Sequence, residues 1–301
     1  MKKDFLTIWD LTSREIESVI DRAVRMKAGR EAASGILQGR SIGLIFEKSS
    51  TRTRVSFEAG IYQLGAQPIY MTSGEIQLGR GESIPDTART LSRYLDAIVI
   101  RTFGHPRLEE FAAHATVPVI NALTDLHHPC QALADLMTVR EKKGAWKGIR
   151  MAYVGDGNNV ANSLIEAASR VGMSLTVGCP EGYEPDADVL GRAREAARGE
   201  VVVLREPREA AGRADVLYTD VWVSMGDEKE AEERRRKFRG YQVNEALLSC
   251  AKPDAVVMHC LPAHRDEEIT AEVLDGPRSV VFDQAENRLH VQKALLAFLL
   301  G

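Results

Sequence analysis

The chain has 301 residues, and its 39 Lys and Arg against 43 Asp and Glu give a formal net charge of −4. This balance argues against a protein that binds nucleic acid along its surface, and 44% hydrophobic residues exclude a disordered chain. No apolar run reaches the about 20 residues of a membrane span. We expect no signal peptide, because no apolar stretch follows Lys2 and Lys3.

Short β-branched runs alternate with longer amphipathic stretches, which predicts an α/β fold of parallel sheets with helices on both faces. The strands form two sets, and at about 150 residues per domain the length also predicts two doubly wound domains linked by helices. The first set of expected strands is 41–46, 67–71, 97–100 and 117–121. The second set is 150–154, 174–177, 200–204, 215–219, 255–259 and 279–282.

The helical stretches place the domain boundaries. The main expected helices are 54–64, 131–143, 163–170 and 286–300. A turn signal at 144–148 follows the second of them, so we expect one domain over 1–146 and another over 147–283. Residues 284–301 form a final helix that we expect to pack back on the first domain.

The segment S-S-T-R-T-R at 49–54 directly follows the first expected strand. A helix N-terminus in this place offers unpaired backbone N–H groups and a partial positive charge. Ser50, Thr51 and Thr53 add hydroxyl groups. Arg52 adds a planar guanidinium suited to phosphate. The alternative is an ordinary Ser/Thr cap with surface arginines, but α/β proteins bind ligands at the carboxyl ends of strands, which favours a phosphate site.

Further polar residues follow the next strands of the first domain. Arg101 comes after the expected strand 97–100, and His128 and Gln131 lie in an H-P-x-Q motif after the strand 117–121. A histidine can donate a hydrogen bond to a carbonyl oxygen, and a glutamine can accept one from an amide NH2 group. The alternative is a loop with a buried histidine. A zinc site using the neighbouring His127 and Cys130 has poor ligand spacing.

The segment G-D-G-N-N at 155–159 resembles the start of a dinucleotide fingerprint. The third glycine is absent, and no acidic residue ends the following strand, so the pattern argues against an NAD site. Two asparagine amides at a strand end suit a small zwitterion better.

Two more strands of the second domain are followed by residues that can take part in binding or catalysis. Asp220 can pair with an ammonium group, and the polar stretch from Ser224 to Arg239 is either a solvated helix or a mobile loop over the site. Cys260 follows a strand within H-C-L-P, where the alternative is a buried thiol. The four cysteines form no CxxC pair, which indicates reduced thiols and a cytoplasmic protein.

Together these motifs resemble the aspartate/ornithine carbamoyltransferase family over essentially the whole chain. S-T-R-T-R and H-P-x-Q mark the broad family, whereas D-x-x-x-S-M-G and H-C-L-P are similar to its ornithine branch. The matching positions, in order, are Ser50-Thr51-Arg52-Thr53-Arg54, Gln77, Arg101, His128-Pro129-Cys130-Gln131, Gly157-Asn158-Asn159, Asp220, Ser224-Met225-Gly226, His259-Cys260-Leu261-Pro262 and Glu286-Asn287-Arg288.

The resemblance implies a first domain that binds carbamoyl phosphate, a second that binds ornithine, and no metal or organic cofactor. It implies trimers, or multiples of trimers, with active sites at subunit boundaries and with the loop around Gln77 reaching a neighbour's site. The reaction it implies joins carbamoyl phosphate and L-ornithine to give L-citrulline and phosphate, a step of arginine metabolism. Neither nucleic acid nor membrane is expected as a partner.

The resemblance also assigns the carbamoyl phosphate contacts. His128, Arg101 and Thr53 would polarise the carbonyl oxygen, on which negative charge builds during attack. The carbamoyl NH2 group would donate to Gln131 and to the backbone carbonyls of Cys260 and Leu261. The phosphate contacts would come from Ser50, Thr51, Arg52, Thr53, Gln77, Arg101 and Arg288.

Ornithine would be held by Asn159, Asp220, Ser224 and Met225. Its δ-amine must be neutral to attack, yet with a pKa near 10.4 only a ~10⁻³ fraction is neutral at pH 7. Cys260, alone or together with Asp220, is the residue expected to steer or accept this proton, and the departing phosphate is another candidate acceptor. Cys260, Arg101 and His128 are thus the expected catalytic residues.

Three alternatives stay open at this point. The amine acceptor can be putrescine or acetylornithine, although the D-x-x-x-S-M-G motif favours an unmodified α-amino acid. The chain can be a catalytically silent relative, against which the intact motifs argue. A nicotinamide-dependent dehydrogenase is disfavoured by the broken glycine fingerprint.

Overall fold

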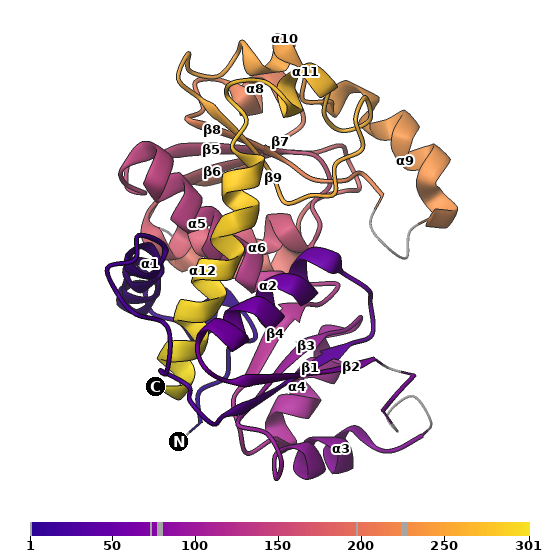
Figure 1. Cartoon of the computed structure of the whole chain (residues 1–301). Coiled ribbons are helices and arrows are strands. Elements are labelled where there is room, and N and C mark those ends of the chain that lie inside the picture. Colours follow the sequence, from indigo (N-terminus) through magenta and orange to yellow (C-terminus); the bar gives the residue numbers. More distant parts are fainter. Residues whose placement is uncertain (1, 73, 77–80, 197, 224–227) are drawn as a thin grey trace. The chain divides into compact units, whose positions relative to one another are not determined.

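The computed structural model describes residues 2–72, 74–76, 81–196, 198–223 and 228–301. The chain divides into two compact units (Figure 1). Unit 1 comprises Met1–Met137 with Glu286–Gly301, and unit 2 comprises Thr138–Ala285. This division falls inside a helix, Pro129–Lys143, and the domain boundary predicted between residues 146 and 147 stays a prediction. Within the described residues, no helix is both long and apolar enough to cross a membrane.

Unit 1 is built on a four-stranded parallel sheet with the order β2-β1-β3-β4. Its strands are β1 (Ser41–Phe46), β2 (Gln67–Thr72), β3 (Ala97–Arg101) and β4 (Val119–Leu123). Its helices are η1 (Ile8–Asp10), α1 (Ser13–Lys27), α2 (Thr51–Gln63), α3 (Ile84–Leu91) and α4 (His105–His114), together with the first part of α5 (Pro129–Lys143) and most of α12 (Val281–Leu300).

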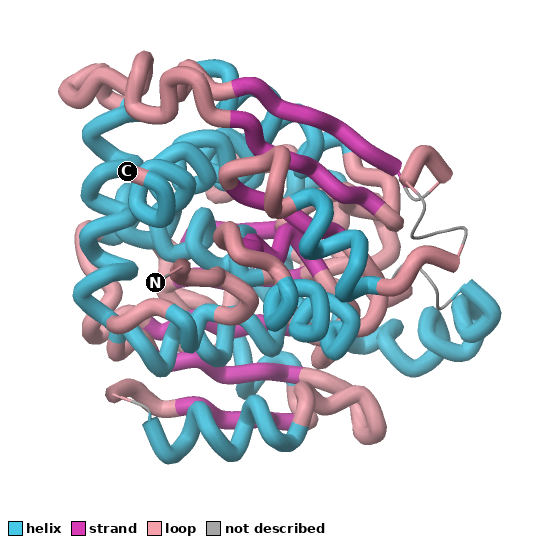
Figure 2. Tube along the Cα trace, turned by 90° about the horizontal axis from the view of Figure 1, so that it is seen from below, coloured by secondary structure: helices cyan, strands magenta, loops and turns pink. Residues whose placement is uncertain are grey.

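Helices cover both faces of the unit 1 sheet (Figures 1 and 2). On one face Ala88 of α3 and Leu108 of α4 pack with Ile98 and Ile100 of β3 in a buried cluster. On the other face α2 lies against α12, and a Cβ added to Gly60 would stand only 3.2 Å from the side chain of Lys293. Burial on both faces explains why β1, β3 and β4 are largely apolar, whereas the edge strand β2 is only partly buried.

Unit 2 has a five-stranded parallel sheet with the order β7-β6-β5-β8-β9. Its strands are β5 (Arg150–Val154), β6 (Ser174–Gly178), β7 (Val201–Leu204), β8 (Val216–Thr219) and β9 (Val256–His259). Its helices are α6 (Asn159–Val171), α7 (Ala187–Ala196), α8 (Pro207–Ala211), η3 (Glu228–Glu230), α9 (Ala231–Phe238), η4 (Arg239–Tyr241), α10 (Glu245–Leu248) and α11 (Ala271–Leu274). The predicted fold class, with two parallel α/β sheets, is confirmed.

Each sheet has one point where the strand order reverses. In unit 1 the chain runs from β1 to β2 on one side and then continues with β3 and β4 on the other, so the reversal lies between β1 and β3. In unit 2 it lies between β5 and β8. In open α/β sheets, ligands bind in the crevice outside the carboxyl ends of the strands at such a reversal. The topology therefore indicates one binding edge in each unit.

The strand predicted at 279–282 is wrong. Only Ser279 pairs with β9, through an isolated bridge to Val257, and α12 begins at Val281. The N–H of Gln284 already donates to the carbonyl of Val280 as the first helical bond. The β-branched run Val280-Val281 resembles a strand in composition, but helical packing decides its conformation. The final helix consequently begins five residues before the predicted Glu286.

Candidate active site

The S-T-R-T-R segment forms the first turn of α2. Ser50 is the N-cap: its hydroxyl accepts from the Thr53 N–H at 3.3 Å and donates to the Thr53 hydroxyl at 3.0 Å. The helix therefore begins at Thr51, earlier than the predicted 54–64. The first N–H groups of a helix have no acceptor within the helix, so this turn presents backbone donors at the carboxyl end of β1. That arrangement suits an anion.

Arg288 of α12 joins this turn to α5. Its Nη2 donates to the Thr53 hydroxyl at 2.7 Å, and its Nη1 donates to Oε1 of Gln131. The amide nitrogen of Gln131 in turn donates to Asp135 at 2.8 Å. All four side chains are buried. Segments far apart in the sequence thus meet around one buried guanidinium, with hydrogen bonds to a charged donor, which are stronger than neutral ones.

Arg101 and His128 complete the predicted set in unit 1. Arg101 is the last residue of β3, in register with Phe46 of β1, and both Arg101 and His128 are buried. The pKa of His128 lies well below its usual value of 6.5, first because of burial and then because of the charges of Arg288, Arg101 and Arg52. The structure therefore gathers three guanidinium groups around a neutral imidazole. Such an imidazole can donate one hydrogen bond to an oxygen that develops negative charge.

Neighbours of His128 in the sequence have packing roles. The ring of His127 makes an edge contact with that of His105, with centroids 4.7 Å apart. The Cys130 thiol donates to the Asn121 carbonyl at 3.3 Å, and burial raises the pKa of Cys130 to about 12. His127, His128 and Cys130 do not form a group with metal-ligand spacing in the described part of the chain. The zinc alternative therefore gains no support.

In unit 2, Asn158 is the N-cap of α6, with its side-chain oxygen 2.9 Å from the Val160 N–H. Its amide nitrogen donates to Asp220 Oδ2 at 2.9 Å. Asn159 is the first helical residue, so the helix begins earlier than the predicted 163–170. The two neighbouring amides therefore differ in role: Asn158 holds Asp220, while Asn159 lies at the helix N-terminus beside it.

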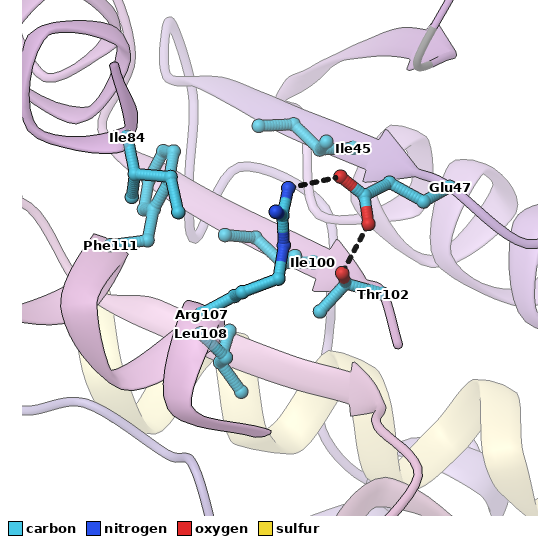
Figure 3. A pocket seen from close by; sticks show the side chains of 8 residues that line it. All are labelled: Ile45, Glu47, Ile84, Ile100, Thr102, Arg107, Leu108 and Phe111. Atoms are coloured by element: carbon cyan, nitrogen blue, oxygen red, sulfur yellow. Dashed lines mark hydrogen bonds and ion pairs between the residues drawn. The ribbon is translucent and has the colours of Figure 1, made fainter. Parts of the chain in front are cut away.

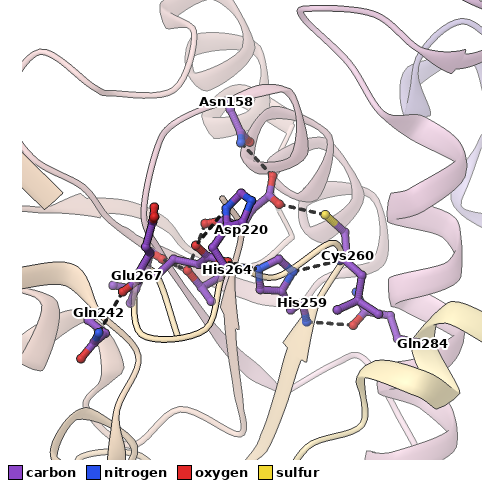
Figure 4. A network of polar contacts seen from close by, with 12 residues as sticks. Asn158, Asp220, Gln242, His259, Cys260, His264, Glu267 and Gln284 are labelled. Atoms are coloured by element: carbon purple, nitrogen blue, oxygen red, sulfur yellow. Dashed lines mark hydrogen bonds and ion pairs between the residues drawn. The ribbon is translucent and has the colours of Figure 1, made fainter. Parts of the chain in front are cut away.

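Asp220, after β8, receives a second hydrogen bond from Cys260, after β9 (Figure 4). The Cys260 thiol donates to Asp220 Oδ1 at 2.9 Å, and the carboxylate is buried. The Asp220 carboxylate therefore accepts one hydrogen bond from an amide and one from a thiol. A proton reaching the Cys260 sulfur can be compensated by transfer of the thiol proton to Asp220, which is the arrangement a proton relay requires.

His259 and Glu268 support this strand end, and the sequence analysis did not identify them as a pair. The Leu261 N–H donates to Nδ1 of His259 at 2.9 Å, so the ring proton sits on Nε2 and faces Glu268 Oε1 at 3.0 Å. Both side chains are fully buried. Leu261 has φ of 58°, which a non-glycine residue adopts only when its surroundings impose it. The sequence contained part of the signal, because His259 belongs to the H-C-L-P motif, but no motif includes Glu268.

Asp220, His259 and Cys260 offer ligand atoms within 4.8 Å of one another, as do His264, Glu267 and Glu268. In the first group, both ring nitrogens of His259 already have hydrogen-bond partners. A metal ion there would have to displace these bonds, so the arrangement fits hydrogen bonding better than metal coordination.

Three predicted site residues, Gln77, Ser224 and Met225, lie outside the described residues. The described part of the polar stretch that follows, from Glu228 to Tyr241, is helical. Arg234 of α9 donates to Asp156 at 2.9 Å and to the Trp222 carbonyl at 3.2 Å. The helix is thus tied to the turn after β5 by a largely buried ion pair, which the composition of the stretch did not predict.

The depressed pKa of His128 makes a prediction about stability. Below pH 6.5 the unfolded chain takes up a proton at this position that the folded chain does not. The free energy of unfolding should therefore be complete above pH 6.5 and fall as the pH is lowered, by up to about 1.4 kcal/mol per pH unit from this group. His128→Asn removes this contribution. Chemical denaturation of both proteins between pH 5 and 8 should show a steeper acid loss for the parent; parallel curves would contradict the assignment.

Comparisons with known proteins agree with this geometry. The family model described as "Aspartate/ornithine carbamoyltransferase, carbamoyl-P binding domain" matches residues 3–141, and the model of the corresponding Asp/Orn binding domain matches residues 147–299. The ornithine carbamoyltransferase of Syntrophus aciditrophicus is 58% identical over 302 residues, covering 100% of both chains. That of Thermococcus kodakarensis is 52% identical, covering 99% of this chain and 96% of the relative.

Solved structures give the same result. The ornithine carbamoyltransferase from Pyrococcus furiosus superposes with a TM-score of 0.95 at 52% identity, covering 100% of this chain and 97% of that one. The enzyme from Thermus thermophilus has a TM-score of 0.91 at 44% identity and full coverage of both chains. The resemblance inferred from the motifs is confirmed: the chain belongs to the aspartate/ornithine carbamoyltransferase family.

Proposed function

We propose that the chain transfers the carbamoyl group of carbamoyl phosphate to the δ-amine of L-ornithine, giving L-citrulline and phosphate. The observation that carries this proposal is the concentration of positive charge in unit 1, where buried Arg101 and Arg288 and partly buried Arg52 lower the pKa of the buried His128. A small dianion with a polarisable carbonyl group matches it. The full-length similarity to relatives named ornithine carbamoyltransferase identifies the second substrate.

Carbamoyl phosphate is assigned to residues 1–146, with the helix at 284–301 supplying Arg288. The N–H and hydroxyl groups of Ser50 to Thr53 and the guanidinium of Arg52 hold the phosphate. His128 and Arg101 donate to the carbonyl oxygen, where charge develops in the transition state. Gln131 already accepts from Arg288, and its remaining lone pair is available to the carbamoyl NH2 group. Contacts of this group with the carbonyls of Cys260 and Leu261, and of Gln77 with the phosphate, remain predictions.

Ornithine is assigned to residues 147–283. Asn159, at the N-terminus of α6, suits the substrate carboxylate. Asp220 suits an ammonium group, with Ser224 and Met225 as further predicted contacts. Both binding edges follow the strand reversals at β1/β3 and β5/β8, where ligand sites of this fold class are found.

The chemistry follows from these assignments. The neutral δ-nitrogen attacks the carbamoyl carbon, a C–N bond forms, and the C–O bond to phosphate breaks. The attacking nitrogen loses one proton. This proton passes either to the departing phosphate or to the Cys260 sulfur. In the second case the thiol proton of Cys260 moves to Asp220, whose Oδ1 lies 2.9 Å from the sulfur. No residue here needs a cofactor for these steps.

We further propose a cytoplasmic homotrimer, or a multiple of trimers, acting in arginine biosynthesis. The four free cysteines support a reducing compartment, and the family resemblance supports the assembly and the pathway.

The direct test of the function is citrulline formation. The purified chain is incubated with carbamoyl phosphate and, separately, with ornithine, putrescine or acetylornithine, and the carbamoylated product and phosphate are quantified. We expect turnover with ornithine and at least about a hundredfold lower kcat/KM with the other two amines, because each lacks one group that the site is built to pair. Preference for putrescine or acetylornithine would reassign the acceptor, and no product with any amine would indicate a silent relative.

Arg52→Ala tests the phosphate assignment. Loss of one charge-assisted anchor should raise the KM for carbamoyl phosphate about ten- to a hundredfold, since hydrogen bonds to charged groups contribute about 1.5–3 kcal/mol. The matched control is Arg54→Ala in the same motif, because Arg54 pairs with Glu58 at 3.1 Å and lies over the Tyr70 ring at 3.6 Å. Equal effects of the two substitutions would show that Arg52 does not contact the phosphate.

A further inference from the structure

Glu47, the residue after β1, makes three contacts around the end of β3 and the start of α4, and Figure 3 shows the two made by its carboxylate. Its N–H donates to the carbonyl of Arg101 at 2.8 Å. Its carboxylate accepts a short hydrogen bond from the Thr102 hydroxyl and another from the Arg107 guanidinium at 3.2 Å. One side chain and its own backbone therefore hold Arg101 and the residue that follows it.

The contact lies on the opposite face of the sheet from the Arg101 side chain. Side chains alternate along a strand, and Glu47 and Thr102 line a small pocket with Ile45 and Ile100, the residues that share their face. Arg101, between Ile100 and Thr102, therefore points to the other face. The hydrogen bond from Thr102 to Glu47 therefore fixes the backbone on one face of the sheet. Because Arg101 is the preceding residue, the same bond sets the direction of its side chain on the other face.

A carboxylate in this place costs free energy of folding. The Glu47 side chain is only 13% exposed, and apart from Thr102 and Arg107 the pocket beside it is formed by apolar side chains such as Leu108 and Phe111. Burying a charge costs free energy unless it is paired, and an apolar residue would complete this core at least as well for folding alone. The charge is better explained by what it positions.

A second contact joins the same two loops. The Lys48 ammonium lies 4.2 Å from the ring centroid of Phe103, and the Phe103 carbonyl accepts from the Asp125 N–H at 2.9 Å. The loops after β1, β3 and β4 are therefore linked directly behind the residues that carry Ser50, Arg101 and His128.

We propose that Glu47 is a positioning residue, which acts through Thr102 to set Arg101 against the Ser50–Thr53 turn. The inference rests on the proposed function only in taking the anion held there to be the phosphate group of carbamoyl phosphate. It adds a role for a residue that does not itself touch the substrate.

The test compares Glu47→Ala, Glu47→Gln and Thr102→Val with the parent. Inorganic phosphate binding is measured by calorimetry, and KM for each substrate is measured by citrulline formation. Glu47→Ala should weaken phosphate binding and raise the KM for carbamoyl phosphate about tenfold or more, because small displacements of a positioned group are costly. The KM for ornithine should stay within about twofold. Thr102→Val should show the same pattern, and Glu47→Gln, whose amide oxygen still accepts from Thr102, should restore most of the affinity.

Arg107→Ala is the control for the other half of the contact. The Arg107 guanidinium contacts Oε1 of Glu47, whereas Thr102 donates to Oε2. Its loss therefore leaves the Thr102 hydrogen bond in place, and the phosphate affinity should stay within about twofold of the parent. If Glu47→Ala fails to fold, Thr102→Val decides the question. Parent-like phosphate affinity in folded Glu47→Ala or Thr102→Val would overturn the proposal, as would an equal rise in both KM values. If Glu47→Ala weakens phosphate binding but the parent forms no citrulline, the proposed function fails and this inference stands.

Discussion

The structure of unit 1 depends on the hydrogen bonds of one buried guanidinium. Arg288, in the C-terminal helix, donates to Thr53 of α2 and Gln131 of α5. A buried charge needs partners, so Arg288 ties the helix to the turn after β1 and to the start of α5. The same guanidinium brings a positive charge to the turn. We therefore expect docking of the last helix to be coupled to formation of the anion site, although Thr53 and Arg288 lie far apart in the sequence.

The three guanidinium groups also show how a protein of net charge −4 can offer a locally cationic site for the proposed dianion. Burial and three guanidinium groups hold the pKa of His128 well below 6.5, so the imidazole donates a hydrogen bond without adding a fourth charge. Unit 2 carries the opposite character at its own strand reversal, where Asp220 accepts from Asn158 and Cys260. The local charges therefore support the proposal that the anion binds to unit 1 and the amine to unit 2, whatever the overall charge.

The sequence predicted the fold class and most strand ends well, because buried parallel strands are apolar runs that polar residues interrupt. It could not predict contacts made across the fold. Nothing in local composition pairs Glu47 with Thr102 or His259 with Glu268. The sequence also placed the start of α6 too late, at residue 163. Because α6 begins at Asn159, Asn158 caps the helix and donates a hydrogen bond to Asp220. The wrong strand at 279–282 has the same cause, since Val280 and Val281 suit a strand by propensity and become helical through packing.

The measurement that tests this account most directly is carbamoyl phosphate binding by Arg288→Lys, by calorimetry beside the parent. Lysine keeps the charge, but its ammonium cannot span Thr53 and Gln131 as the planar guanidinium does. With the thermal midpoint of the variant checked in parallel, we predict at least about a tenfold loss of affinity. Parent-like affinity in a folded Arg288→Lys protein would contradict the claim that this guanidinium organises the anion site.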